Sequence, residues 1–431
     1  MELIKLQEEE FKEFAYQHEQ ASFLQTIGWG KLKNKNGWDY EFLGFKDQKK
    51  IVAATLLLSK MTPIKKKMFY APHGFVLDYS DYSLLDEFVL KMKKYVKEHN
   101  GIFFKIDPYL MLIERDMDGK RVDNGIDHTE IYKHLRKLGF DEINGKVTEQ
   151  TLQGKWLYRI DINDRDIDEV MKDMTSKTRQ MIRKNEKNGV IVREGFVEEL
   201  ETFKDIMDHT SERREFLSRS LSYYKNMYEI LNQEGICKIH FAEIHLKQQL
   251  DKFRAEVQSI QNEYNSKQID FDAGKLKVNE KKFYAKQKEL LDNMARLEKS
   301  IKDYEQLQEK NGDVLVLGAI MYMIHGSEVI SFIGGAYQEY LDFQPFYSIH
   351  YELIKYACAN HYRYYNFYGI SGNLVESDPM YGIYLFKKGF GGQVVELMGE
   401  FDMPVSKFYY RLYRISYAII HKLKKLKTKM H

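Results

Sequence analysis

Two apolar seams with heptad spacing, close together in the middle of the chain, constrain the fold more than any other feature. Apolar residues recur at alternating spacings of four and three within each seam, and most other residues are Lys, Glu, Gln, Asn or Asp. The seams consist of Leu246, Leu250, Phe253, Val257, Ile260 and Tyr264, and of Leu290, Met294, Leu297, Ile301 and Tyr304. The segment Asp270 to Gly274 divides them, so we expect an antiparallel helical hairpin over residues 245–311. At 1.5 Å per residue, two helices of about 25 to 30 residues form an arm on the order of 40 Å long. A dimerising coiled coil is the alternative.

On either side of the arm the pattern is that of an α+β protein. Buried strands are expected at residues 51–58, 101–107 and 314–324, where apolar residues run without interruption. Helical periodicity appears at residues 83–97 and 347–359. Each half of the chain offers a strand hairpin, a helix and a strand that ends near a turn. This weak repetition indicates two related α+β domains, with the hairpin inserted into the second.

Composition excludes several classes of protein. The 431 residues include 66 Lys and Arg against 64 Asp and Glu, and only two Cys. Two cysteines support neither a disulfide framework nor a four-Cys zinc site, and Cys237 and Cys358 both stand in apolar surroundings. The acidic, amphipathic start is unlike a signal peptide, and no stretch is apolar enough to span a bilayer, so we expect a cytoplasmic protein. The sequence contains no GxxxxGK[ST], HExxH, GxSxG or GxGxxG motif, and we expect no metal or cofactor.

Charge is concentrated in two basic runs. The first, residues 176–193, is expected to be a helix that ends at Asn188 and Gly189, followed by a short strand. Its cations could contact an RNA backbone or simply form a solvated face; the candidates are Lys177, Arg179, Arg183 and Lys184. The second run is the C-terminal tail, residues 417–429, where lysines alternate with apolar residues. It suits either an anionic membrane surface or plain solvent.

Three further segments carry residues suited to chemistry. Asp107 follows an apolar strand and precedes a proline, where a carboxylate serves either catalysis or the turn. A helical interpretation of residues 210–224 places Arg219 and Tyr223 on one face, with Phe216 one turn earlier; Arg suits a phosphate or carboxylate, or a surface ion pair. The run at residues 386–392 places lysines between phenylalanines, where burial is costly without an anionic partner.

Seven segments together resemble the Fem family of peptidoglycan-bridge aminoacyltransferases. They span nearly the whole chain in the family's order, with the coiled coil where FemA-like and FemX-like members carry it. The segments are Gln25 to Lys33, Tyr70 to Tyr79, Lys105 to Tyr109, Thr210 to Tyr224, Phe332 to Ala336, Tyr365 to Gly372 and Gly382 to Phe390. His73 departs from the family's usual Gly or Arg.

The resemblance implies a reaction and the residues for it. An amino acid (Gly, Ala or Ser) passes from aminoacyl-tRNA to the stem-peptide amine of lipid II, a lipid II-glycine form or the soluble UDP-linked muramyl-pentapeptide precursor. Lys387 would stabilise the oxyanion, Phe386 would shape the site, and Asp107 is a proposed base. By motif position, the substrate-binding residues would be Lys33, Trp29, Arg219, Tyr223 and Phe216.

The resemblance also implies two GNAT-like acyltransferase domains. We expect domain 1 over residues 1–155 with residues 396–431 packed on it, and domain 2 over residues 156–244 and 312–395, with the arm at 245–311. The expected partners are the tRNA, the precursor and the inner membrane face, the last by peripheral contact, and the protein is a monomer or homodimer. Two alternatives remain: an acyl-CoA-type N-acyltransferase and a non-catalytic tRNA-binding or coiled-coil scaffold.

Overall fold

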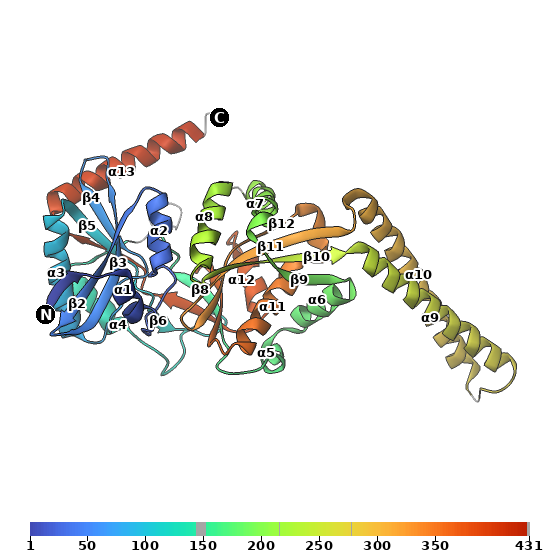
Figure 1. Cartoon of the computed structure of the whole chain (residues 1–431). Helices are drawn as coiled ribbons and strands as arrows, with labels where there is room; N and C mark the ends of the chain where they lie inside the picture. Colours follow the sequence, from blue (N-terminus) through green and yellow to red (C-terminus); the bar gives the residue numbers. More distant parts are fainter. Residues whose placement is uncertain (144–151, 215, 277, 429–431) are drawn as a thin grey trace.

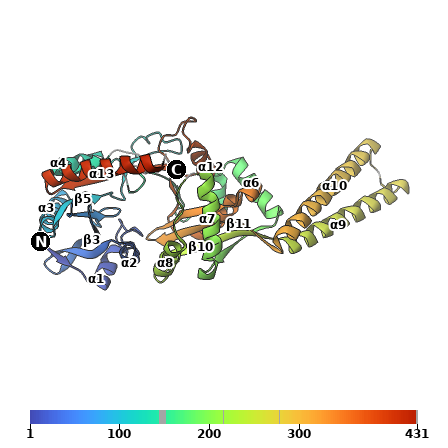
Figure 2. The ribbon, with the colours of Figure 1, turned by 90° about the horizontal axis from the view of Figure 1, so that it is seen from above.

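Two β-sheets lie side by side, and a long helical hairpin projects from the second (Figure 1). The computed structural model describes residues 1–143, 152–214, 216–276 and 278–428. Seen from above, the hairpin points away from the first sheet (Figure 2). The mixed α+β fold class with an inserted arm is therefore confirmed.

The first sheet has seven strands in the order β1-β2-β3-β4-β5-β15-β7, antiparallel except for the β4–β5 pair. Its strands are β1 (Glu2–Lys5), β2 (Asp39–Asp47), β3 (Lys50–Met61), β4 (Lys67–Ala71), β5 (Gly101–Ile106), β7 (Asp141–Ile143) and β15 (Glu400–Pro404). The helices associated with it are α1 (Glu8–Ala15), α2 (Ile27–Lys35), α3 (Tyr82–Glu98), α4 (Thr129–Leu138) and α13 (Lys407–Thr428). The strand expected at residues 101–107 and the helix expected at 83–97 are both present as β5 and α3.

The second sheet has eight strands in the order β6-β14-β8-β13-β12-β11-β10-β9. They are β6 (Met111–Glu114), β8 (Trp156–Asp161), β9 (Val190–Gly195), β10 (Cys237–His245), β11 (Val314–His325), β12 (Glu328–Ala336), β13 (Tyr364–Gly369) and β14 (Gln393–Leu397). The helices that follow or cover these strands are α5 (Ile167–Asp173), α6 (Ser176–Lys187), α7 (Leu200–Arg214), α8 (Leu221–Asn232), α11 (Pro345–Ala359) and α12 (Tyr381–Lys388), with 3-10 turns η1 (Val197–Glu199) and η2 (Gln338–Phe343). β6 belongs to the chain segment assigned to the first domain, yet it pairs with β14 in the second sheet.

The arm consists of α9 (Leu246–Asp272) and α10 (Glu280–Asn311), inserted between the paired strands β10 and β11. Its two helices run antiparallel: Phe253 contacts Tyr304 near the base, and Phe271 stacks on Phe283 near the tip at 3.9 Å between ring centroids. The predicted hairpin is confirmed, with one correction. α9 continues through Asp272, because Phe271 packs against the partner helix and extends the seam into the expected break.

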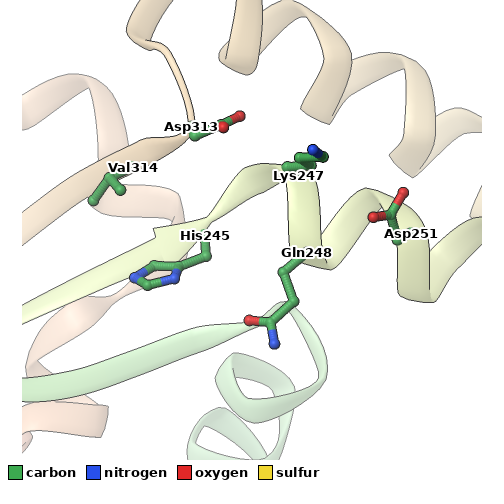
Figure 3. Close-up of a pocket in the computed structure, with 6 residues that line it drawn as sticks. All are labelled: His245, Lys247, Gln248, Asp251, Asp313 and Val314. Carbon is green, nitrogen blue, oxygen red and sulfur yellow. The ribbon is translucent and has the colours of Figure 1, made fainter.

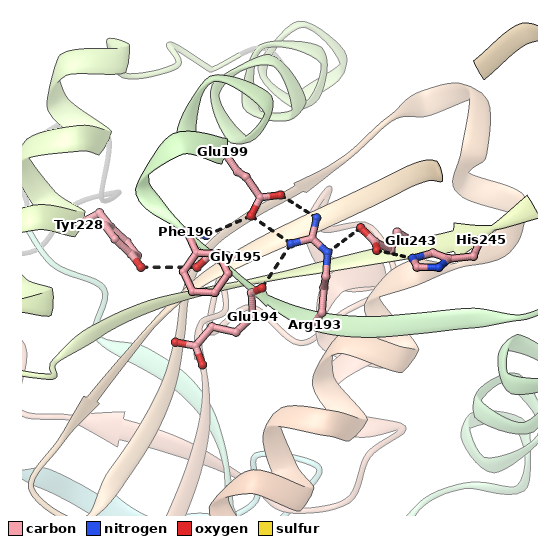
Figure 4. A network of polar contacts seen from close by, with 8 residues as sticks. All are labelled: Arg193, Glu194, Gly195, Phe196, Glu199, Tyr228, Glu243 and His245. Atoms are coloured by element: carbon pink, nitrogen blue, oxygen red, sulfur yellow. Dashed lines mark hydrogen bonds and ion pairs between the residues drawn. The ribbon is translucent and has the colours of Figure 1, made fainter. Parts of the chain in front are cut away.

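A network of charged side chains fixes the base of the arm (Figure 4). Arg193 of β9 joins two carboxylates, with Nη2 2.6 Å from Glu199 Oε1 and Nε 2.9 Å from the buried Glu243 Oε2. Glu243 Oε1 also lies 2.9 Å from His245 Nε2, at the residue before α9 begins. A cavity of about 280 Å³ opens beside His245 and Asp313, where the arm leaves the sheet (Figure 3). These contacts anchor the arm; the candidate catalytic residues lie elsewhere.

The prediction of a single helix over residues 210–224 is wrong. α7 ends at Arg214 and α8 begins at Leu221, with Ser220 as its N-cap: the Ser220 Oγ accepts from the Tyr223 N–H at 3.2 Å. Ser and Thr at this position stop one helix and start another, because the side chain replaces the missing backbone acceptor. Arg219 therefore lies in the connection, and its contact with Tyr223 comes from a turn.

The junction of the two sheets is packed. One apolar cluster includes residues from the first segment, such as Phe23 and Trp29, and others from the second sheet, such as Met321. The rings of Phe23 and Phe332 lie 5.2 Å apart across this junction. The two halves thus share a core, and side chains that face the junction from either sheet are held in fixed relative positions.

Candidate functional site

Lys387 is a buried lysine whose side chain is only 8% exposed. It lies in the last turn of α12, and its Nζ donates to the backbone carbonyls of Gly369 at 2.6 Å and Tyr368 at 3.2 Å. Among the described residues, no carboxylate forms an ion pair with it. Burial lowers the pKa of Lys387 to about 7, because a desolvated cation with only neutral acceptors is costly. A third N–H of this ammonium remains for another acceptor.

A strained turn aims those two carbonyls at Lys387. The register of β13 against β8 shifts between Asn366 and Gly369, and Tyr368 has a left-handed φ of 63°. Its N–H donates to the Asn366 Oδ1 at 2.8 Å, and the buried Asn366 amide donates to Glu328 Oε2 at 3.1 Å. Because a non-glycine residue adopts this φ only when its surroundings impose it, the buried Asn366 maintains the bulge.

Aromatic rings enclose the same end of α12. The Phe386 ring is 5.0 Å from that of Tyr347 and 5.3 Å from that of Phe390, and it packs against the core of the second sheet. His350 lies behind it, with Nδ1 2.6 Å from the Tyr365 hydroxyl. Burial, and secondarily the Lys387 charge, lowers the pKa of His350 to about 3. The wall beside Lys387 is therefore apolar and uncharged.

Asp107 lies at the end of β5, on the other sheet. Its carboxylate accepts from the Tyr70 hydroxyl at 3.0 Å and from the His73 N–H at 2.7 Å, in a buried position. Burial, and then the nearby Glu400 charge, raises the pKa of Asp107 well above its ordinary value. Strongly perturbed pKa values cluster at functional sites, which makes Asp107 a candidate acid or base.

Gln153 connects the Asp107 region to the Lys387 region. Its N–H donates to Glu400 Oε1 at 2.7 Å, and its side-chain oxygen accepts from the Tyr368 hydroxyl at 2.9 Å. Tyr368 is also the residue whose carbonyl accepts from Lys387. Gln153 and Tyr368 thus connect Lys387 of α12 to Glu400 of β15, whose charge acts on Asp107.

A second cluster carries the predicted substrate-binding cations. Lys33 of α2 lies over the Trp29 ring at 4.5 Å, and Arg219 lies over the Tyr223 ring at 5.4 Å. Burial, then the charges of Arg219 and Lys60, lowers the pKa of Lys33 to about 8. Two cations that face each other without an acidic partner, in the described part of the chain, form a favourable site for an anion such as a phosphate. The structure thus brings together four of the five predicted residues.

Phe216 is the exception among the predicted substrate-binding residues. Its side chain is exposed in the connection between α7 and α8. No ring contact described in the structure joins it to Arg219 or Tyr223. The expected one-turn spacing fails because that segment is not a helix.

Of the four candidate tRNA-binding cations on α6, three are exposed: Lys177, Arg183 and Lys184. Arg179 differs, because its guanidinium donates to the Met171 carbonyl at 3.2 Å and to the Met174 carbonyl. Both carbonyls lie at the end of α5, where intrahelical donors run out, so Arg179 caps a neighbouring helix. The predicted helix end is present, since α6 stops at Lys187 and Gly189 has a φ of 79°.

Sequence reasoning missed Asn366, Glu328 and Gln153, although Asn366 stands inside a quoted segment. A buried amide after an apolar strand is a weak signal by itself, and its partners come from distant segments. Within the described residues, no group of three or more His, Cys, Asp or Glu is arranged to hold a metal, and no described helix is long and apolar enough to cross a bilayer.

Comparison with known proteins gives a consistent result. The sequence model described as the FemAB family matches residues 6–418. The chain is 29% identical over 430 residues to aminoacyltransferase FemA of Staphylococcus epidermidis, covering 99% of this chain and 100% of that one. It is 29% identical over 415 residues to FemA of Staphylococcus aureus strain MRSA252, covering 96% and 97%. A crystal structure of FemX shares the fold, with a TM-score of 0.82 at 24% identity over 96% of this chain and 99% of that one.

Proposed function

The chain belongs to the FemAB family, and from this premise we propose that it is an aminoacyltransferase that extends the peptidoglycan interpeptide bridge. In the proposed reaction an amino acid moves from aminoacyl-tRNA to an amine of the precursor's stem peptide or bridge. Two relatives named aminoacyltransferase FemA align with it over 97% or more of their length, so the activity concerns the whole chain.

The observation that carries this proposal is the environment of Lys387. The acceptor amine attacks the carbonyl carbon of the tRNA ester, an N–C bond forms, and the carbonyl oxygen becomes an oxyanion. Lys387, already held by two carbonyls, has an N–H left to donate to that oxyanion. Collapse then breaks the ester C–O bond, and the ribose hydroxyl leaves with a proton.

Proton transfer is the proposed task of Asp107. Its raised pKa suits a carboxylate that accepts the proton from the attacking amine and returns one to the ribose oxygen. Phe386 and its aromatic neighbours keep water from the ester. Because aminolysis of an activated ester is downhill, holding both substrates together supplies most of the rate; proximity alone is worth roughly 7–11 kcal/mol.

Each substrate has its own proposed binding surface. Lys33 and Arg219 hold the precursor's diphosphate, Tyr223 offers a ring face to the sugar, and the buried Trp29 supports Lys33 from beneath. The acceptor is either lipid II, reached by peripheral contact with the inner membrane face, or the soluble UDP-linked muramyl-pentapeptide. Lys177, Arg183 and Lys184 contact the tRNA backbone.

The function is tested by following radiolabelled Gly, Ala and Ser from charged tRNA to purified lipid II, with the UDP-linked precursor in parallel. We expect one amino acid and one acceptor to give a labelled product. If tRNA binds and no combination gives product, the scaffold alternative replaces the enzyme. If acetyl-coenzyme A, and not the tRNA, donates the acyl group, the acyl-CoA-type N-acyltransferase replaces the proposed function.

Arg219→Ala is expected to raise the KM for the precursor about 10- to 100-fold with little change in kcat, because a charge-assisted contact to phosphate is worth about 1.5–3 kcal/mol. The measurement is steady-state transfer with the full precursor and with an amine-bearing stem peptide that lacks the diphosphate. Lys35→Ala is the matched control, since Lys35 lies two residues from Lys33 and bonds only to Asn226 in the described structure. An equal loss with both acceptors would contradict a diphosphate site.

The ratio of the parent's transfer rate to that of Lys387→Met is expected to fall as the pH rises above about 7. Burial lowers the Lys387 pKa to about 7, and only the protonated form carries the charge that stabilises an oxyanion. We therefore compare single-turnover rates of the parent and Lys387→Met between pH 6 and 9. Taking the ratio cancels the titration of the acceptor amine, which both proteins share. A ratio that is constant or grows with pH would rule out the protonated lysine.

A further inference from the structure

The outer face of α13 carries an exposed apolar stripe. It comprises Phe408, Leu412, Ile415 and Ile419, whose side chains are between 40% and 67% exposed. Spacings of four, three and four place all four residues on one side of the helix. Isolated exposed apolar residues are ordinary, but four in a line along one helix mark a binding surface.

The opposite face of α13 holds the helix on the body of the protein. Tyr410 and Tyr413 pack against Phe103 of β5, with ring centroids 5.2 and 5.1 Å apart, and the Tyr410 hydroxyl donates to Asp402 at 2.7 Å. The helix therefore lies on the first sheet with its apolar stripe turned outward. It then rises away from the sheet at the upper edge of the molecule (Figure 1).

Charge around the stripe is of one sign. Lys407, Arg411 and Arg414 are exposed on the same helix, and residues 407–428 contain no Asp or Glu. The sequence continues the pattern with four more lysines before Thr428. An apolar stripe flanked by cations is the composition of helices that lie in the interface of an anionic bilayer, where Lys and Arg are attracted to the lipid headgroups.

The turn between β3 and β4 extends this surface. Lys66 Nζ lies 5.0 Å from the Tyr409 ring of α13, and Met61 and Lys65 are exposed on the same turn. Lys60, at the end of β3, is close enough to Lys33 for its charge to affect that group. Basic residues thus continue from α13, across the turn, to the site proposed for the diphosphate.

We propose that the outer face of α13 and the β3–β4 turn dock on an anionic lipid bilayer and present the Lys33 and Arg219 site to lipid-linked precursor at its surface. The acceptor part of this inference rests on the proposed function; the docking itself does not. A second copy of the chain is a poorer occupant, because a symmetric contact would place two basic helices against each other.

The test is cosedimentation of the full chain with vesicles of equal parts phosphatidylglycerol and phosphatidylcholine. Leu412→Glu with Ile415→Glu is expected to reduce the bound fraction at least about tenfold, since it removes two apolar anchors and adds two repelled charges. The matched control is Leu90→Glu with Leu291→Glu, two leucines 66% and 45% exposed on α3 and α10. The control pair should bind these vesicles as the parent does. Vesicles of phosphatidylcholine alone should bind neither the parent nor the control pair.

Three results would overturn docking: equal binding to both vesicle types, equal loss in the control pair, or stripe-dependent dimers without vesicle binding. Transfer to lipid II in detergent micelles, which needs no bilayer, is measured on the same variants as a check of folding. Loss of vesicle binding and of transfer to lipid II in vesicles, with micelle transfer retained, supports the whole inference. If no acceptor gives product with any variant while vesicle binding follows the stripe, the proposed function fails and docking stands.

Discussion

Lys387→Met is expected to reduce the transfer rate about 10²- to 10³-fold, as loss of a donor to a developing oxyanion typically does. Binding of aminoacyl-tRNA should be retained, because Lys387 is buried among carbonyls and apolar rings, whereas the α6 cations proposed to bind the tRNA are exposed. Single-turnover transfer and a separate tRNA-binding titration measure the two properties. A non-catalytic scaffold would be indifferent to the change in both.

Lys388→Met supplies the control at the neighbouring position. Lys388 is partly exposed and pairs with Asp118, so it shares helix, charge and side chain with Lys387 but has a different environment. Transfer by Lys388→Met should stay within about threefold of the parent, since a surface ion pair contributes about 1 kcal/mol or less. Comparable losses in both variants would show that α12 matters only for folding.

Lys387→Met is also expected to change how the free energy of unfolding depends on pH. The pKa of Lys387 falls from 10.5 to about 7 in the folded protein, so between these values the unfolded state binds more protons. The free energy of unfolding of the parent therefore rises with pH across that window. Lys387→Met should lack this rise and be at least as stable as the parent at pH 7. Such a lysine is retained at a cost in stability, which is typical of functional groups.

Lys105→Met is expected to destabilise the protein by about 3–5 kcal/mol, the largest stability effect among these variants. Lys105 Nζ lies 2.9 Å from both Glu400 Oε2 and Asp402 Oδ1, and all three side chains are buried. Removing the cation leaves two buried carboxylates without a positive charge beside them. Urea denaturation measures the change, with Lys67→Met as control, because its partner Asp39 is exposed and the pair contributes little.

Two further measurements separate charge from packing at Lys105. Burial raises the pKa of Glu400, and Lys105 opposes that rise; without the cation the folded protein binds this proton still more tightly than the unfolded chain does, so the deficit should shrink as the pH falls. Adding Glu400→Gln and Asp402→Asn to Lys105→Met should recover most of the stability at neutral pH. A deficit that is independent of pH and is not recovered would assign the effect to lost packing.

Features that depend on neighbouring residues were predictable from the sequence. The arm follows from two heptad seams, and the end of α6 follows from Asn188 and Gly189, because periodicity and backbone preference act over a few residues. The strands β3, β5 and β11 follow from continuous apolar runs. Most of the predicted site residues came from motifs in register, which requires no knowledge of contacts.

Features that depend on distant partners were decided by the tertiary structure. Lys105 and Glu400 are 295 residues apart, and no local signal says that they meet. Only the fold shows that Arg179 lies beside the end of α5 and bonds to its carbonyls. The helix expected over residues 210–224 is interrupted because Ser220 caps a new helix. The sequence alone determined the local elements and the family resemblance. The tertiary structure determines which polar groups are removed from water and which protein groups they contact instead. This burial and these contacts shift the pKa values of Lys387 and Asp107.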